Sequence, residues 1–133
     1  MQIKLLKNLA LVTVASGLLS TCAIPAELQA KMDEYARTIP TCSDNADCER
    51  KWSLARAWVE ANSDFAIRGE SDTRIMATSN IISTSGMGVV VTRVAANGGD
   101  QITVDLECFA AYGCPNIWDS KLDFNLAVNS ANN

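Results

Sequence analysis

Cysteines are the residues of this 133-residue chain whose spacing most directly predicts chemistry. Five residues separate Cys42 from Cys48, and five separate Cys108 from Cys114. In an oxidising compartment an even set of cysteines predicts disulfides, and four cysteines allow three pairings. We favour the two local loops, and a zinc site is the alternative. Zinc sites usually have closer cysteine spacing and often histidine, and this chain has no histidine, so we expect no metal.

Missing histidine also bears on catalysis. It removes Ser-His-Asp and Cys-His mechanisms, and paired cysteines leave no thiolate nucleophile. Asp105 and Glu107 are the remaining candidates, because residues two apart on a strand point to the same face and two carboxyls can perform acid–base hydrolysis. A solvated sheet face also explains them. We therefore expect no catalytic residues and no cofactor, with a small carboxylate-dependent hydrolase as an alternative.

Three arginines form a candidate binding surface, because each falls in a predicted strand. They are Arg68, Arg74 and Arg93. The alternation of the strands places Arg68 and Arg74 on the face that carries Asp105 and Glu107, so cross-strand ion pairs would explain them. The functional hypothesis is a patch that binds a carboxylate or phosphate group, such as that of a cell-wall peptide.

Helices and strands must position these side chains. Apolar spacing predicts helices over residues 25–38 and 48–62, with Lys51 on the solvated side of the second. Strands are expected over 65–68, 73–78, 89–95 and 101–109, and Asn97-Gly98-Gly99-Asp100 predicts a hairpin between the last two. A helix over 116–128, with Leu122 and Leu126 among its apolar residues, precedes a loose tail from about residue 129.

This order predicts an α+β fold in two layers: two N-terminal helices, a four-stranded antiparallel meander and one C-terminal helix. Asp44, Asn45 and Asp47 do not match a calcium-binding loop, and a helix-capping turn explains them better. Without linkers or repeats, residues 22–133 form a single disulfide-stabilised domain.

The first 21 residues have the features of an export signal. Lys4 and Lys7 precede an apolar run over residues 9–19, which is too short to span a bilayer. Leu19-Ser20-Thr21-Cys22 resembles the lipobox of bacterial lipoproteins, although Gly or Ala usually stands where Thr21 does. This resemblance implies lipidation of Cys22, and Ala23 after it implies the outer membrane. The alternative is cleavage after Ala23, which would leave a free periplasmic protein.

Charge limits the partners. From Cys22 onward the chain has nine basic and fifteen acidic residues. An acidic chain without a basic stripe is a poor binder of nucleic acid and of anionic lipid.

Two resemblances extend the interpretation. The segments Cys42–Cys48, Lys51-Trp52, Ala57-Trp58-Val59 and Cys108–Pro115 resemble a group of small exported or lipoprotein-type proteins of Gram-negative bacteria. This implies export and disulfides but no active site. The loop Ser83–Gly88 is similar to the Ser/Gly-rich loop of periplasmic lysozyme inhibitors, although a flexible connection also explains it.

These observations favour a non-catalytic protein of the bacterial cell envelope, held by a lipid anchor, that binds an envelope protein or a cell-wall component. The alternatives are a periplasmic inhibitor of a hydrolase such as lysozyme, and the carboxylate-dependent hydrolase.

Overall fold

The computed structural model describes residues 22–79, 85–114 and 116–132, so the predicted export signal lies outside the described residues. Three helices and four strands follow one another in the order α1 (Ala26–Thr38), α2 (Asn45–Asn62), β1 (Gly69–Glu70), β2 (Arg74–Ala77), β3 (Met87–Val94), β4 (Gln101–Cys108) and α3 (Ile117–Asn129). The strands form one antiparallel sheet in the order β1-β2-β3-β4. The predicted α+β class and the helix-helix-strands-helix order are confirmed.

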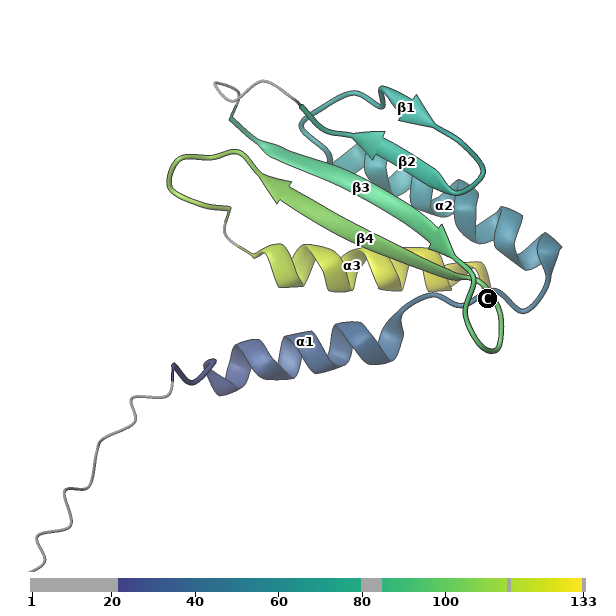
Figure 1. The fold of residues 1–133 in the computed structure, drawn as a ribbon, viewed down its shortest axis with the longest axis horizontal. Helices are drawn as coiled ribbons and strands as arrows, with labels where there is room; N and C mark the ends of the chain where they lie inside the picture. The colour runs from purple at the N-terminus through teal and green to yellow at the C-terminus, as the bar shows by residue number, and fades with distance from the viewer. Residues whose placement is uncertain (1–21, 80–84, 115, 133) are drawn as a thin grey trace, which may run out of the picture.

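One face of the sheet is covered and the other is not. Helices α2 and α3 pack behind the sheet in Figure 1, and no described element covers the face toward the viewer. Alternate strand residues point to opposite faces, so every second residue enters the core. The buried strand residues are Ile75, Ala77, Val89, Val91, Ile102 and Val104, and they meet Trp52, Ala55, Trp58, Val59, Phe124 and Val128 of the helices.

Helix α1 lies beside α3 and protects the edge strand β4 (Figure 1). The Tyr35 hydroxyl donates to the carbonyl of Val104 at 3.2 Å and accepts from the Val104 N–H at 3.4 Å. At the start of β4, Ile102 N–H donates to the carbonyl of Pro40 at 2.9 Å. An exposed edge strand is a template for unwanted pairing, and these contacts occupy the edge groups of Ile102 and Val104.

The first strand differs from its prediction. Residues 65–68 are not a strand, and β1 is the two-residue segment Gly69–Glu70. The chain reverses after β1, because the Ser71 hydroxyl accepts the N–H groups of Thr73 and Arg74. Such local side-chain bonds to the backbone fix turns.

Helix α2 begins three residues earlier than predicted, because Asp44 caps it by accepting the N–H of Asp47 at 2.8 Å. The expectation that Lys51 is solvated is wrong. Its side chain is 4% exposed, and its ammonium lies 2.9 Å from the Asp47 carboxylate and 2.7 Å from the carbonyl of Thr41. Lys51 can be buried because Asp47, one helical turn away, and the carbonyl of Thr41 bind its ammonium.

Helix α3 differs from its prediction at Leu126. Phe124, Asn125 and Val128 are buried, whereas Leu126 is 73% exposed. The loose tail is also not observed, since α3 continues to Asn129 and a 3-10 turn follows over Ser130–Asn132. The Asn129 amide donates to the carbonyl of Thr38 at 2.9 Å and so fixes this end of α3 to α1.

Disulfides lie at both ends of the domain. Cys42 is joined to Cys48 at the start of α2, and Cys108 is joined to Cys114 between β4 and α3. These are the local pairings that the spacing favoured. Such bonds are typical of an oxidising, exported environment. No helix within the described ranges has the length and apolar composition needed to cross a bilayer.

Candidate functional site

The uncovered face of the sheet is the candidate binding surface, and we call it the open face. The strand register assigns eleven residues to it: Gly69, Arg74, Met76, Gly88, Val90, Thr92, Val94, Gln101, Thr103, Asp105 and Glu107. The face is mixed in character. It carries one cation, on β2, and two carboxylates, on the edge strand β4.

Arg74 lies in a row without an opposing charge. The register places Thr92 directly opposite Arg74, and Thr103 opposite Thr92. The expected cross-strand ion pair with Asp105 or Glu107 does not form, because these carboxylates belong to rows further along the sheet. Arg74 is exposed, and no described residue accepts a hydrogen bond from its guanidinium, so its donors can meet a ligand.

Most other cations of the protein are already paired. In the described ranges, which include all nine basic residues after Cys22, seven form ion pairs: Lys31, Arg37, Arg50, Lys51, Arg56, Arg93 and Lys121. Within the same ranges, Arg68 and Arg74 have none. In an acidic domain, two exposed arginines without carboxylate partners are the cations that an anionic ligand can reach without displacing a carboxylate.

A shallow hollow adjoins Arg74. It has a volume of about 200 Å³ and is lined by Gly69, Glu70, Ser71, Arg74 and Met76. Gly69 pairs with Met76 across the strands, and the methyl of Met76 lies 3.2 Å from where a Cβ on Gly69 would stand. The backbone N–H of Arg74 donates to the hydroxyl of Ser71, with 3.1 Å between the nitrogen and the oxygen. The backbone of Arg74 is therefore fixed by a hydrogen bond, and the side chain of Met76 lines the hollow next to it.

Arg68 does not occupy the strand position that was expected. It precedes β1, and its N–H donates to the carbonyl of Met76 at 2.9 Å. Its side chain is exposed. Because the residue lies outside the strand, the alternation that assigned its face to that of Arg74 does not apply.

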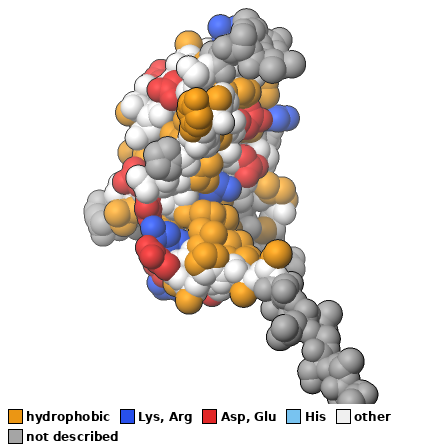
Figure 2. All heavy atoms as spheres, turned by 90° about the vertical axis from the view of Figure 1, so that its left-hand side faces the viewer, with side chains coloured by type: hydrophobic (Ala, Val, Ile, Leu, Met, Phe, Trp, Pro, Cys, Tyr) orange, Lys and Arg blue, Asp and Glu red, His pale blue; other side chains and the backbone are white. Residues whose placement is uncertain are grey.

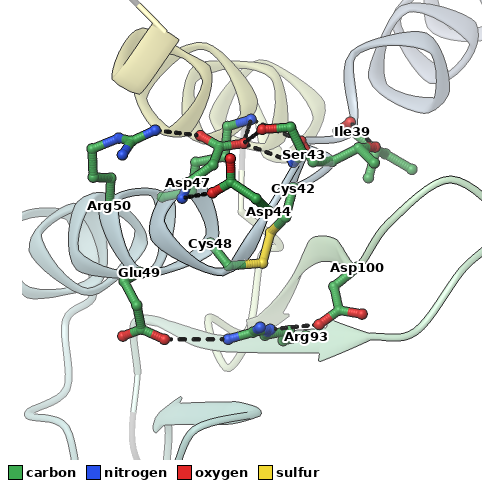
Figure 3. The surroundings of a disulfide bond; sticks show 12 residues. Ile39, Cys42, Ser43, Asp44, Asp47, Cys48, Glu49, Arg50, Arg93 and Asp100 are labelled. Atoms are coloured by element: carbon green, nitrogen blue, oxygen red, sulfur yellow. Dashed lines mark hydrogen bonds and ion pairs between the residues drawn. A yellow bond between two sulfur atoms is a disulfide. The ribbon is translucent and has the colours of Figure 1, made fainter.

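Arg93 is separate from the other two arginines. It pairs with Ile102, so it lies on the helix-covered face, and its side chain is 16% exposed. Figure 3 shows its guanidinium between two carboxylates, with Nε 2.8 Å from Asp100 and Nη1 3.6 Å from Glu49. Arg93 thus joins α2 to the β3–β4 hairpin. Its contacts are structural, and the structure does not bring the three arginines into one patch.

A buried ion pair lies beside this cluster. Asp47 accepts the N–H of Ser43 at 2.9 Å and lies 2.9 Å from the Lys51 ammonium (Figure 3 shows its surroundings). The Ser43 N–H, followed by the Lys51 ammonium, lowers the pKa of Asp47 to about 2. Lys51 also donates to the carbonyl of Thr41. Both charged groups therefore bind partners within the domain, and through Ser43 and Thr41 they stabilise the loop before α2.

The two carboxylates proposed for hydrolysis have different partners. Asp105 lies 3.5 Å from the ammonium of Lys121, which also lies over the rings of Tyr35 and Trp118. Glu107 accepts a hydrogen bond from the hydroxyl of Thr78. Both side chains are exposed on the edge strand. Each carboxylate thus has its own side-chain partner on an exposed part of the sheet.

The loop proposed for hydrolase inhibition is described only in part. Residues 80–84 lie outside the described residues, so the first two positions of Ser83–Gly88 are not placed. The rest is tied to the domain, because Asp64 accepts the N–H of Met87 at 2.7 Å and Asp64 N–H donates to the Met87 carbonyl at 3.1 Å. Gly86 has φ 130° and Asp64 lies against it, which favours glycine there.

Sequence reasoning missed the neighbours that make Arg74 accessible. Met76 and Thr92 contribute to its surroundings, yet neither was singled out. Alternation from the Asn97–Asp100 hairpin fixes the β3–β4 register, but the β2–β3 register depends on a connection that passes through residues 80–84. The sequence therefore lacked the signal that places Thr92 beside Arg74.

The four paired cysteines and Cys22 complete the set of predicted site residues. Cys42 and Cys48 are buried, while Cys108 is exposed. Cys22 is free and exposed, four residues before α1 begins. Comparison of the chain with protein-family models, curated proteins and solved structures finds no match.

Proposed function

We propose that this protein is a non-catalytic binding module of the bacterial cell envelope, and that its open face receives a partner bearing carboxylate groups. The observation that carries the proposal is the pairing of seven cations inside the domain while Arg74, beside an open sheet face, has no ionic partner among the described residues. An arginine fork binds a carboxylate with two parallel hydrogen bonds.

The rest of the open face suits an extended chain. Met76 and Val94 supply apolar contacts, and Thr92 and Thr103 supply hydroxyls between them. The peptides of the bacterial cell wall are extended and carry free carboxylates, so they match both features. Arg68 is a second exposed arginine without an ion pair among the described residues.

Location supports the same proposal. The disulfides fit an exported protein, and Cys22 ends the segment Leu19–Cys22 that resembles a lipobox. We propose that acyl chains on Cys22 hold the domain at the outer membrane, facing the periplasm. The intact mass of the mature protein tests this anchor: a start at Cys22 with acyl chains supports it, and a start at Ile24 without lipid contradicts it.

Sedimentation with purified cell-wall sacculi tests the binding. Hydrogen bonds to charged groups contribute about 1.5–3 kcal/mol, so Arg74→Gln is expected to lower affinity by roughly ten- to a hundredfold. Arg37→Gln is the matched control, because Arg37 is an exposed arginine of α1 already paired with Glu34. Equal binding of the two variants would contradict the site. No binding of the unchanged protein would remove the wall peptide as the partner.

A further inference from the structure

One end of the molecule gathers the start of α1 and the loop that precedes α3 (the left end in Figure 1). Helices α1 and α3 start there together, and the Lys31 ammonium lies 2.8 Å from the Asp119 carboxylate. Between the two helix starts, Leu28 and Lys31 share the lining of a hollow of about 260 Å³ with Cys114 and Trp118. The Cys108–Cys114 loop is therefore adjacent to the beginning of α1.

The connection from Cys22 to this end is short. Three residues separate Cys22 from Ala26, the first residue of α1. A fully extended chain covers about 3.3–3.6 Å per residue, so Cys22 lies at most about 14 Å from Ala26. Acyl chains on Cys22 would therefore hold the starts of α1 and α3 close to the bilayer surface, with no room for a long tether.

The loop closed by the second disulfide has the composition of a membrane-contacting segment. Its five inner residues, over 109–113, carry no charge. Phe109 packs edge-to-face on Phe65 at 5.5 Å between ring centroids and so holds the loop to the sheet. Tyr112 projects outward with a relative exposure of 104%, and Ile24 is 50% exposed. Tyrosine is enriched at membrane–water interfaces because its ring is apolar and its hydroxyl is polar.

Charges at this end do not favour attraction to anionic lipid. Lys31 is balanced by Asp119 and by Glu27, whose carboxylate lies 3.7 Å from the ammonium. Figure 2 looks at this end and shows hydrophobic side chains gathered on it, with positive and negative ones beside them. A contact with the membrane here would therefore depend on apolar and aromatic side chains and not on a basic patch.

We propose that the Cys108–Cys114 loop rests on the bilayer that holds the acyl chains of Cys22, with the Tyr112 ring in the interfacial layer; this rests on the anchor included in the proposed function. The strands run from this end to the opposite one (Figure 1), so they stand away from the membrane. The open face is then roughly perpendicular to the membrane surface, and a partner in the periplasm can reach Arg74.

Hydrogen exchange measured by mass spectrometry tests the contact. The mature chain is coupled through Cys22, its free cysteine among the described residues, to a maleimide lipid in phosphatidylcholine vesicles, without reductant. Within the described chain, the amides of Ala110, Ala111 and Tyr112 donate no hydrogen bond, so they exchange fast in solution. We expect several-fold slower exchange for residues 109–114 on vesicles, and no change in the 95–100 hairpin at the far end.

Variants of Tyr112 supply the matched comparison. Tyr112→Asp is expected to restore fast exchange on vesicles, while Tyr112→Phe keeps it slow. Because the chemical tether replaces the natural anchor, the result does not depend on acylation in cells, which the intact mass tests separately. Exchange of residues 109–114 that is the same on vesicles and in solution overturns the proposal. Slowing that requires anionic lipid would also overturn it, because the contact would then be electrostatic.

Discussion

Removing each disulfide in turn gives a sharp test of the packing, because the two loops have the same length and different burial. Each bond closes a loop with a sequence separation of 6, and the chain-entropy relation gives about 2.3 kcal/mol of stabilisation for either one. Entropy alone therefore predicts equal losses for the two double cysteine-to-serine variants.

Burial makes the losses unequal. Cys42 and Cys48 are 3% and 2% exposed, so two serine hydroxyls in their place would be shielded from water. An unsatisfied buried polar group costs about 1–3 kcal/mol. We expect Cys42→Ser/Cys48→Ser to lose roughly 4 kcal/mol, and Cys108→Ser/Cys114→Ser to lose only the entropic part of roughly 2 kcal/mol.

Urea denaturation followed by tryptophan fluorescence measures both losses. A difference of about 2 kcal/mol corresponds to roughly 8 °C or more in Tm for a domain near 100 residues, which is easily measured. Equal losses would refute the role assigned to burial. An unchanged stability without the Cys108–Cys114 bond would refute that disulfide in the native protein.

Three further predictions concern single residues. The pKa of Asp47 in the folded state is about 2, below its ordinary value of 3.8; its stabilisation is complete above about pH 4 and lost as pH falls to 2, so the urea midpoint of Asp47→Asn should depend less on pH across that window. Tyr35→Phe removes two hydrogen bonds with Val104 and should cost about 1 kcal/mol, with faster exchange of the Val104 amide; unchanged exchange would contradict the edge contact. Gly99→Ala brings a Cβ within 2.0 Å of a backbone oxygen, whereas Gly98→Ala meets open space, so Gly99→Ala should lower Tm more, and equal shifts would contradict the hairpin packing.

Much of the fold follows from local patterns. The Asn97–Asp100 turn and the alternation of Ile102 and Val104 predicted the β3–β4 hairpin, because glycines with positive φ and a period of two leave few alternatives. Ile75, which the alternation of its strand places opposite Arg74, is fully buried. These elements depend on neighbours close in the sequence.

The errors depend on contacts between distant segments. Lys51 was assigned to solvent by its polarity, and the buried position follows from Asp47 and the carbonyl of Thr41, which a helical wheel does not show. Leu126 is exposed because α3 packs through other residues: Phe124 meets Trp58 of α2, and Asn125 donates to Tyr35 and Thr38 of α1. Arg93 left the predicted patch because its strand position faces α2, where Glu49 and Asp100 hold it.

The candidate site was half predictable. Arg74 was singled out from the sequence, since its strand position opposite the core follows from Ile75. Its lack of an ion pair was not predictable, because the row of Thr92 and Thr103 depends on registers between three strands. Whether Arg74 has an ion pair depends on where the folded chain places every carboxylate near it.

Site-specific photocrosslinking tests the central claim most directly. A photoreactive amino acid replaces Thr92, next to Arg74 on the open face, and in a control it replaces Ser53, exposed on α2. In the cells that produce the protein, we expect an adduct to the cell wall from position 92, none from position 53, and loss of the adduct when Arg74→Gln is added. An adduct that survives Arg74→Gln, or equal adducts from both positions, would contradict binding through the open face.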